Sequence, residues 1–141
     1  MAIAVMLPEN TGGAETLTTI WENASPSSSF LNGGKTLTES MSGYKRIRIV
    51  FRPFSATDES VLGILEVPVD TITNFQNNAN QPYFGLNGWG SSYQYMRGVY
   101  VPDDAQTSLD KLYFLHCYRV GSSTSTTYDQ YCVPLYVYGI R

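Results

Sequence analysis

Hydrophobic and polar residues alternate along several stretches of the chain, most clearly near its end. The stretches Lys111–Val120 and Tyr128–Tyr138 are rich in β-branched and aromatic residues, and the polar run Gly121–Thr127 separates them. Folding the chain about that run predicts a β-hairpin with one apolar face, built from every second residue of both strands. The expected facing pairs are Leu112 with Val137, Phe114 with Leu135, His116 with Val133 and Tyr118 with Tyr131.

The same register places Cys117 opposite Cys132. Directly opposed strand residues come close enough for a cross-strand disulfide. In a reducing cytoplasm the two side chains remain thiols, and we expect thiols rather than a bridge.

Further strand patterns recur along the chain, and little of it is typical of helix. The expected extended segments are Glu15–Glu22, Phe30–Leu31 (ended by the turn Asn32–Gly34), Lys35–Met41, Tyr44–Phe54, Val61–Val69, Tyr83–Leu86 and Tyr93–Tyr100. Pro68 indicates an edge strand, and Asp70–Pro82 is expected to be a long loop or a single helical turn. This spacing predicts an all-β fold, an antiparallel, jelly-roll-like β-sandwich of about eight strands.

The length of 141 residues fits a single domain, which we place at residues 15–141. Residues 1–14 are expected to form an N-terminal arm or a first strand, and the apolar run Ile3–Leu7 suits contact with a neighbouring subunit. This start has no basic leader typical of a signal peptide, and no apolar run approaches the length that inserts into a membrane.

Charge is sparse and slightly acidic. Charged residues make up 15% of the chain, and the formal net charge is −3. Nucleic acid is therefore not an expected partner, because binding to phosphates needs clustered Lys and Arg. The one basic run, Lys45–Arg52, predicts a strand with Ile47, Ile49 and Phe51 inward and its arginines Arg46, Arg48 and Arg52 outward, able to pair with acids on a neighbouring strand or subunit. A phosphate or sialic-acid site there is the alternative.

Catalytic and metal-binding patterns are not evident. The single histidine, His116, falls on the apolar face of a strand, where we expect a packed and hydrogen-bonded residue rather than a general base. The acidic pairs Asp58–Glu59 and Asp103–Asp104 lie in loops and are more typical of solvated turns than of a glycosidase pair. We expect no catalytic residue, no metal site and no cofactor.

A binding pattern is present at Asn87–Tyr93, where Trp89 stands between two glycines in an expected loop. An exposed indole can stack on the apolar face of a sugar ring, while amides and hydroxyls bind its oxygens. The candidate ligand-binding residues are Trp89, Tyr93 and Asn87, followed by Tyr95 and Arg97. The alternative is that Trp89 folds back and caps the core.

Three motifs resemble a known family. They are Leu17–Glu22, the run Lys35–Phe51 that contains Thr-Leu-Thr-Glu-Ser-Met-Ser-Gly-Tyr, and the terminal Leu135–Arg141. Together they resemble the C-terminal head domains of bacteriophage tail-fibre and receptor-binding proteins. Glu22 and Asn23 replace the small residues that usually follow the Trp, and Asp70–Ser108 matches no part of the pattern.

This resemblance implies a homotrimeric β-sandwich adhesin that is made in the host cytoplasm and built into the virion. Its expected partners are a bacterial surface saccharide or protein receptor and other virion proteins. The alternatives are a purely structural virion protein (a capsid decoration, head-fibre or baseplate component) and a polysaccharide-degrading tail enzyme. The matched motifs carry no catalytic residues.

Overall fold

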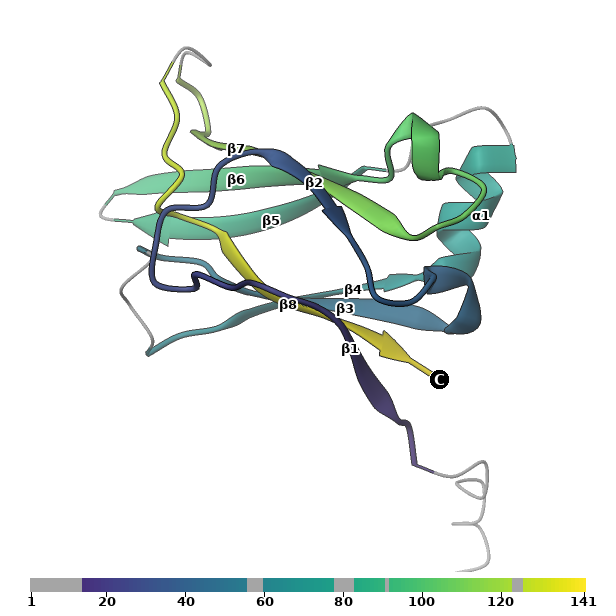
Figure 1. Cartoon of the computed structure of the whole chain (residues 1–141). Coiled ribbons are helices and arrows are strands. Elements are labelled where there is room, and N and C mark those ends of the chain that lie inside the picture. Colours follow the sequence, from purple (N-terminus) through teal and green to yellow (C-terminus); the bar gives the residue numbers. More distant parts are fainter. Residues whose placement is uncertain (1–13, 56–59, 78–82, 91, 123–125) are drawn as a thin grey trace, which may run out of the picture.

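Two antiparallel sheets of four strands face each other in the computed structural model, and the only α-helix of the described residues lies at one end of the sandwich (Figure 1). The structure describes residues 14–55, 60–77, 83–90, 92–122 and 126–141. The first sheet has the strand order β1 (Leu17–Glu22), β8 (Val133–Ile140), β3 (Arg46–Arg52), β4 (Gly63–Pro68). The second has the order β2 (Gly33–Thr36), β7 (Lys111–Arg119), β6 (Tyr93–Tyr100), β5 (Tyr83–Gly90). The helix is α1 (Val69–Asn77), and the short 3-10 helices are η2 (Met41–Gly43) and η3 (Asp103–Ala105). The described residues thus confirm the predicted all-β sandwich of about eight strands.

The strand pairing is partly that of a jelly roll. β1 pairs with β8 and β2 pairs with β7, as in a jelly roll, where the outer strands of the sequence pair first with last. β3 and β4 form a hairpin instead, and so do β5 and β6. Each hairpin therefore stays within one sheet, and β4 and β5 become the edge strands on the same side of the sandwich.

The predicted terminal hairpin is wrong, because β7 and β8 belong to different sheets. β8 lies between β1 and β3, and β7 lies between β2 and β6. The predicted alternation is confirmed for Leu112 and Phe114 of β7 and for Val137 and Leu135 of β8, which are all buried in the core. These four side chains meet across the sandwich and not along one sheet. The alternation is wrong for His116 and Tyr118, which are only partly buried, because Cys117 takes the buried position in this half of β7.

The predicted arginine strand is confirmed as β3, except that its last arginine is buried. Ile47, Ile49 and Phe51 point inward and are buried. Arg46 and Arg48 face outward and pair with Glu66 on β4 at 2.7 and 2.6 Å. Arg52, predicted to face outward, is instead buried and donates a hydrogen bond to the carbonyl of Pro26.

Three other segments differ from the prediction. The glycines of Asn32–Gly34, read as a turn, belong to β2, and the side chains of Lys111 and Tyr113 cover Gly34. The segment after β4 forms a nine-residue helix and not a single turn. β5 continues to Gly90, so Trp89 lies in a strand and not in a loop. The expected edge position of the strand with Pro68 is confirmed in β4.

The expected N-terminal arm and the pair Asp58–Glu59 lie outside the described residues. In the described part of the chain, no helix is long and apolar enough to cross a membrane.

Candidate functional site

The predicted ligand-binding residues divide between the outside and the inside of the second sheet. Trp89 is 58% exposed, Tyr93 is 48% exposed, and Asn87 is exposed as well. Tyr95 and Arg97 are only 4% and 0% exposed. Because side chains alternate along a strand, Asn87 and Trp89 lie on the outer face, while Tyr95 and Arg97 point into the core. The five residues therefore do not form one site.

Trp89 and Asn87 share the outer face with the side chains that lie opposite them on β6. Asn87 pairs with Met96, which is 45% exposed, and Trp89 pairs with Gln94. The indole does not cap the core, since more than half of its surface is open. This strip of β5 and β6 thus presents a flat aromatic ring, an amide and a thioether to the outside.

A groove of about 570 Å³ continues from this strip across the same face. Gly85 and Gly98 face each other across β5 and β6 at its floor, where neither contributes a side chain. A glycine inside a strand often marks a place where a ligand or another chain approaches the backbone. The lining of the groove is mostly apolar and includes Tyr83, Met96, Leu115, Tyr118 and Val120. We call this surface, together with Trp89 and Asn87, the outer groove.

A stack of three tyrosines lies at the end of the outer groove away from Trp89. Tyr83 stacks on Tyr100, and Tyr100 stacks on Tyr113, with 5.0 Å between ring centroids in both pairs. Burial beside the neighbouring tyrosines raises the pKa of the Tyr100 hydroxyl, so this hydroxyl stays neutral near pH 7. The stack fixes one end of the groove because three strands contribute to it.

Tyr93 lies at the tip of the β5–β6 hairpin, opposite Gly90. The guanidinium carbon of Arg119 stands 4.2 Å from its ring centroid, a cation–π contact. Tyr93 alternates with Gln94 along β6, so it faces the side away from Trp89. It is exposed, as a ligand contact would be, but it does not face the outer groove.

Arg97 is a structural residue of the interior. Its guanidinium donates to the carbonyls of Cys132 (2.9 Å), Leu115 (2.6 Å), Asp129 (3.3 Å) and Tyr131 (3.2 Å). The carboxylate of Asp129 lies 3.6 Å away. Burial lowers the pKa of Arg97, while the negative charge of Asp129 raises it. The guanidinium still stays charged, because arginine is not deprotonated in proteins. The contacts with Asp129, Tyr131 and Cys132 hold the segment before β8 in place, the contact with Leu115 ties Arg97 to β7, and the fully buried side chain leaves no surface for a ligand.

Asp129 also connects this segment to β7. It accepts a hydrogen bond from the backbone N–H of Cys117 at 2.9 Å, and its other oxygen lies 2.7 Å from Nδ1 of His116. His116 is hydrogen-bonded, as the sequence indicated, but its side chain is 30% exposed and not a core residue. Among the described residues, no cluster of three or more His, Cys, Asp or Glu could hold a metal ion.

Cys117 and Cys132 are both free and buried, and the thiol of Cys132 donates a hydrogen bond to the carbonyl of Tyr95 at 3.8 Å. Their proximity was predicted correctly from an incorrect strand pairing, since they meet between the sheets. The neighbouring thiol of Cys117, together with burial, raises the pKa of the Cys132 thiol, which therefore stays protonated. The remaining acidic pair is solvated: Asp103 accepts from Gln106, and Asp104 pairs with Lys111.

Sequence reasoning missed the floor and the far end of the outer groove. Gly85 and Gly98 carried a usable signal, since each interrupts an alternating strand pattern. Leu115 and Tyr118 carried none, because any strand can present such residues on either face.

Comparison of the chain with protein-family models, with curated proteins and with solved structures finds no match.

Proposed function

We propose that this chain is a non-enzymatic receptor-binding domain of a bacteriophage virion, which attaches to a saccharide of the bacterial surface through the outer groove. The observation that carries the proposal is the exposure of Trp89 on a strand that also presents Asn87. Strand residues are held more rigidly than loop residues, so the indole is a preorganised platform for a sugar ring.

The surroundings of Trp89 supply what sugar recognition requires. Sugar rings have apolar C–H faces that stack on indoles, and hydroxyl groups that bind amides. The indole of Trp89 and the side chains of Asn87 and Gln94 provide both kinds of contact on one face. The apolar groove beyond Met96 extends this surface, so that a ligand longer than one sugar unit can lie along it. The resemblance to phage receptor-binding heads supports the same assignment.

The test is binding of the intact chain to an array of bacterial surface polysaccharides, for the wild type and for Trp89→Ala. We expect the wild type to bind at least one polysaccharide and the variant to lose that binding. The free energy of unfolding should change by less than about 1 kcal/mol, as is usual for exposed substitutions. Leu17→Ala is the matched control, because Leu17 is 45% exposed on the other sheet.

One result would contradict the proposal, and a second would make this variant uninformative. Retained binding by Trp89→Ala would remove the indole from the site. A large loss of stability in that variant would show that Trp89 acts in folding, and its effect on binding would then carry no information on the site; Trp89→Phe, which keeps an aromatic ring, would decide between these roles.

A structural role in the virion is the second candidate, and the exposed side of β4 favours it. Ile64 is 62% exposed, and Leu62 and Val61 beside it are 55% and 42% exposed. An apolar edge strand of this kind is typical of a surface that another chain covers. A chain that acts only in assembly would bind no polysaccharide and would lose assembly on Ile64→Glu.

A further inference from the structure

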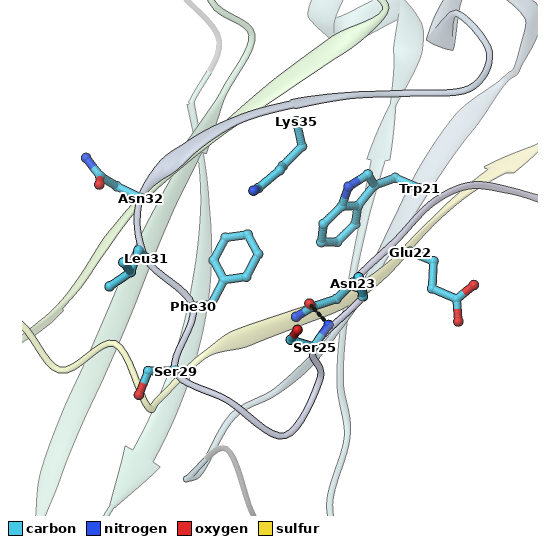
Figure 2. Close-up of a pocket in the computed structure, with 10 residues that line it drawn as sticks. Trp21, Glu22, Asn23, Ser25, Ser29, Phe30, Leu31, Asn32 and Lys35 are labelled. Atoms are coloured by element: carbon cyan, nitrogen blue, oxygen red, sulfur yellow. Dashed lines mark hydrogen bonds between the residues drawn. The ribbon is translucent and has the colours of Figure 1, made fainter.

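A second cleft opens between β1 and β2, on the side of the sandwich opposite the edge strands β4 and β5. The connection between β1 and β2, residues 23–32, crosses from one sheet to the other there and forms one wall (Figure 2). The cleft has a volume of about 340 Å³. That is the lower end of the range for ligand pockets, and it suits a single sugar unit.

The apolar part of this cleft consists of Trp21 and Phe30. Their ring centroids are 6.0 Å apart, and the rings are nearly perpendicular. Phe114 supports both rings from the core, at 5.6 Å from Trp21 and 5.5 Å from Phe30. The half-buried indole of Trp21 is therefore held in place with part of its surface in the cleft.

Lys35 adds a positive charge at the same place. Its ammonium stands 5.2 Å from the centroid of the Phe30 ring, and Figure 2 shows it directed into the cleft. Glu22, the acid that lines the cleft, directs its carboxylate away from it (Figure 2). The guanidinium carbon of Arg97 lies 5.3 Å from the same Phe30 ring, which adds positive potential beneath the cleft.

Polar groups of the connection complete the wall. Asn23 donates to the carbonyl of Pro134 at 2.8 Å and accepts from the backbone N–H of Ser25 at 2.9 Å, which fixes the start of the connection. Ser25 and Ser29 also line the cleft. Serine hydroxyls donate and accept, so they can bind the hydroxyl groups of a ligand.

We infer that this cleft binds an acidic sugar unit of a polysaccharide, a hexuronic acid, with its carboxylate on Lys35 and its ring against Trp21. A half-buried lysine in an aromatic cleft favours a carboxylate, because a charge-assisted hydrogen bond is strongest where water is partly excluded. The ring and hydroxyl contacts distinguish a sugar acid from a simple carboxylate. This site is separate from the outer groove and does not rest on the function proposed for it.

The test is titration of the intact chain with sodium glucuronate, followed by the two indole N–H signals in NMR spectra. The chain has only two tryptophans, so a Trp89→Phe variant assigns both signals. We expect glucuronate to shift the Trp21 signal and leave the Trp89 signal unchanged. Glucose, which has the same ring without the carboxylate, and sodium acetate, which has the carboxylate without the ring, should each bind at least about tenfold more weakly.

Substitutions of Lys35 test the charge. Lys35→Met keeps an aliphatic chain over Phe30 and should raise the dissociation constant for glucuronate at least about tenfold, while Lys35→Arg should retain binding. Lys45→Met removes the same charge at an exposed position before β3 and should leave binding unchanged. Equal binding of acetate, equal loss in Lys45→Met, or no shift of the Trp21 signal would overturn the inference.

These experiments test the cleft and the outer groove independently of each other. Trp89→Ala should leave the glucuronate response of Trp21 unchanged even when it abolishes binding to the polysaccharide array. A loss of glucuronate binding in that variant would overturn the separation of the cleft from the outer groove.

Discussion

At the scale of single residues, Arg97 determines how the segment before β8 is built. Cys132 has a φ of 49°, the left-handed region that non-glycine residues rarely adopt. Such a conformation costs on the order of 1–3 kcal/mol and persists only where its surroundings enforce it. Arg97 supplies that enforcement, because it donates to the carbonyl of Cys132 and to those of Asp129 and Tyr131 just before it.

We therefore expect Arg97→Met to lower the free energy of unfolding by about 3 kcal/mol or more, as when one member of a buried charged network is removed. The carboxylate of Asp129 would remain buried, and several carbonyls would lose their donor. Arg48→Met is the control, since Arg48 is half-exposed in a surface pair and should cost less than about 1 kcal/mol. Urea unfolding measures the free energy of unfolding of both variants. Equal losses in Arg97→Met and Arg48→Met would contradict a structural role for Arg97.

The position of Arg97 could have been predicted from its strand neighbours. Tyr95, Arg97 and Val99 share one face of β6, and Val99 is an obvious core residue. Residue type outweighed alternation in the prediction, because charged residues are seldom fully buried. Trp89 shows the opposite case: its exposure was one of two alternatives, the other being that it caps the core, and both were argued from a loop that is really the end of β5.

At the scale of elements, alternation predicts which residues face the core but not which strand is the neighbour. A hairpin and a crossing between sheets bury the same residues of β7 and β8, so the pattern alone cannot separate them. β8 is a central strand, flanked by β1 and β3, and only the pairing of the whole first sheet decides this. The outer groove was unpredictable for the same reason, because it depends on Gly85 and Gly98 becoming neighbours.

Arg46 and Arg48 of β3 pair with Glu66 of β4, and we call these ion pairs the arginine ladder. The ladder predicts how the stability of the fold depends on pH. The hydrogen bond from Arg48, then the one from Arg46, holds the pKa of Glu66 below its ordinary value. The unfolded chain thus binds the proton more readily, and the stabilisation is present above the unfolded pKa of about 4.3 and lost as the pH falls through the folded value. We expect the urea midpoint of the wild type to fall more between neutral pH and about pH 3 than that of Arg48→Gln.

Lys45→Gln is the control for this pH experiment, because it removes the same charge from an exposed position. Its midpoint should follow the wild type. If Arg48→Gln and the wild type lose equal stability on acidification, the Arg48–Glu66 pair contributes nothing to the acid response.

At the scale of the whole molecule, the proposed binding surfaces and the exposed apolar residues at β4 lie on different faces, although β4 and β5 are edge strands on the same side of the sandwich. The outer groove covers the face of the second sheet, the cleft lies between β1 and β2, and Val61, Leu62 and Ile64 lie at β4. A fibre-tip protein needs this separation, because subunit contacts must leave the receptor surface open. The β4 edge is therefore the part of the described surface that we expect another copy of the chain to cover.

The oligomeric state tests this arrangement. We expect the intact chain to be a homotrimer by light scattering after gel filtration, and Ile64→Glu to shift it towards monomer, since a buried unpaired charge opposes association. A chain that starts at Glu15 tests whether residues 1–14 also hold the subunits together. Glu66→Gln is a poor control, as it would disturb the arginine ladder, so Leu17→Glu on the opposite edge strand serves instead. A monomer for the intact chain would contradict the trimeric adhesin and favour a decoration protein that is completed only on its capsid.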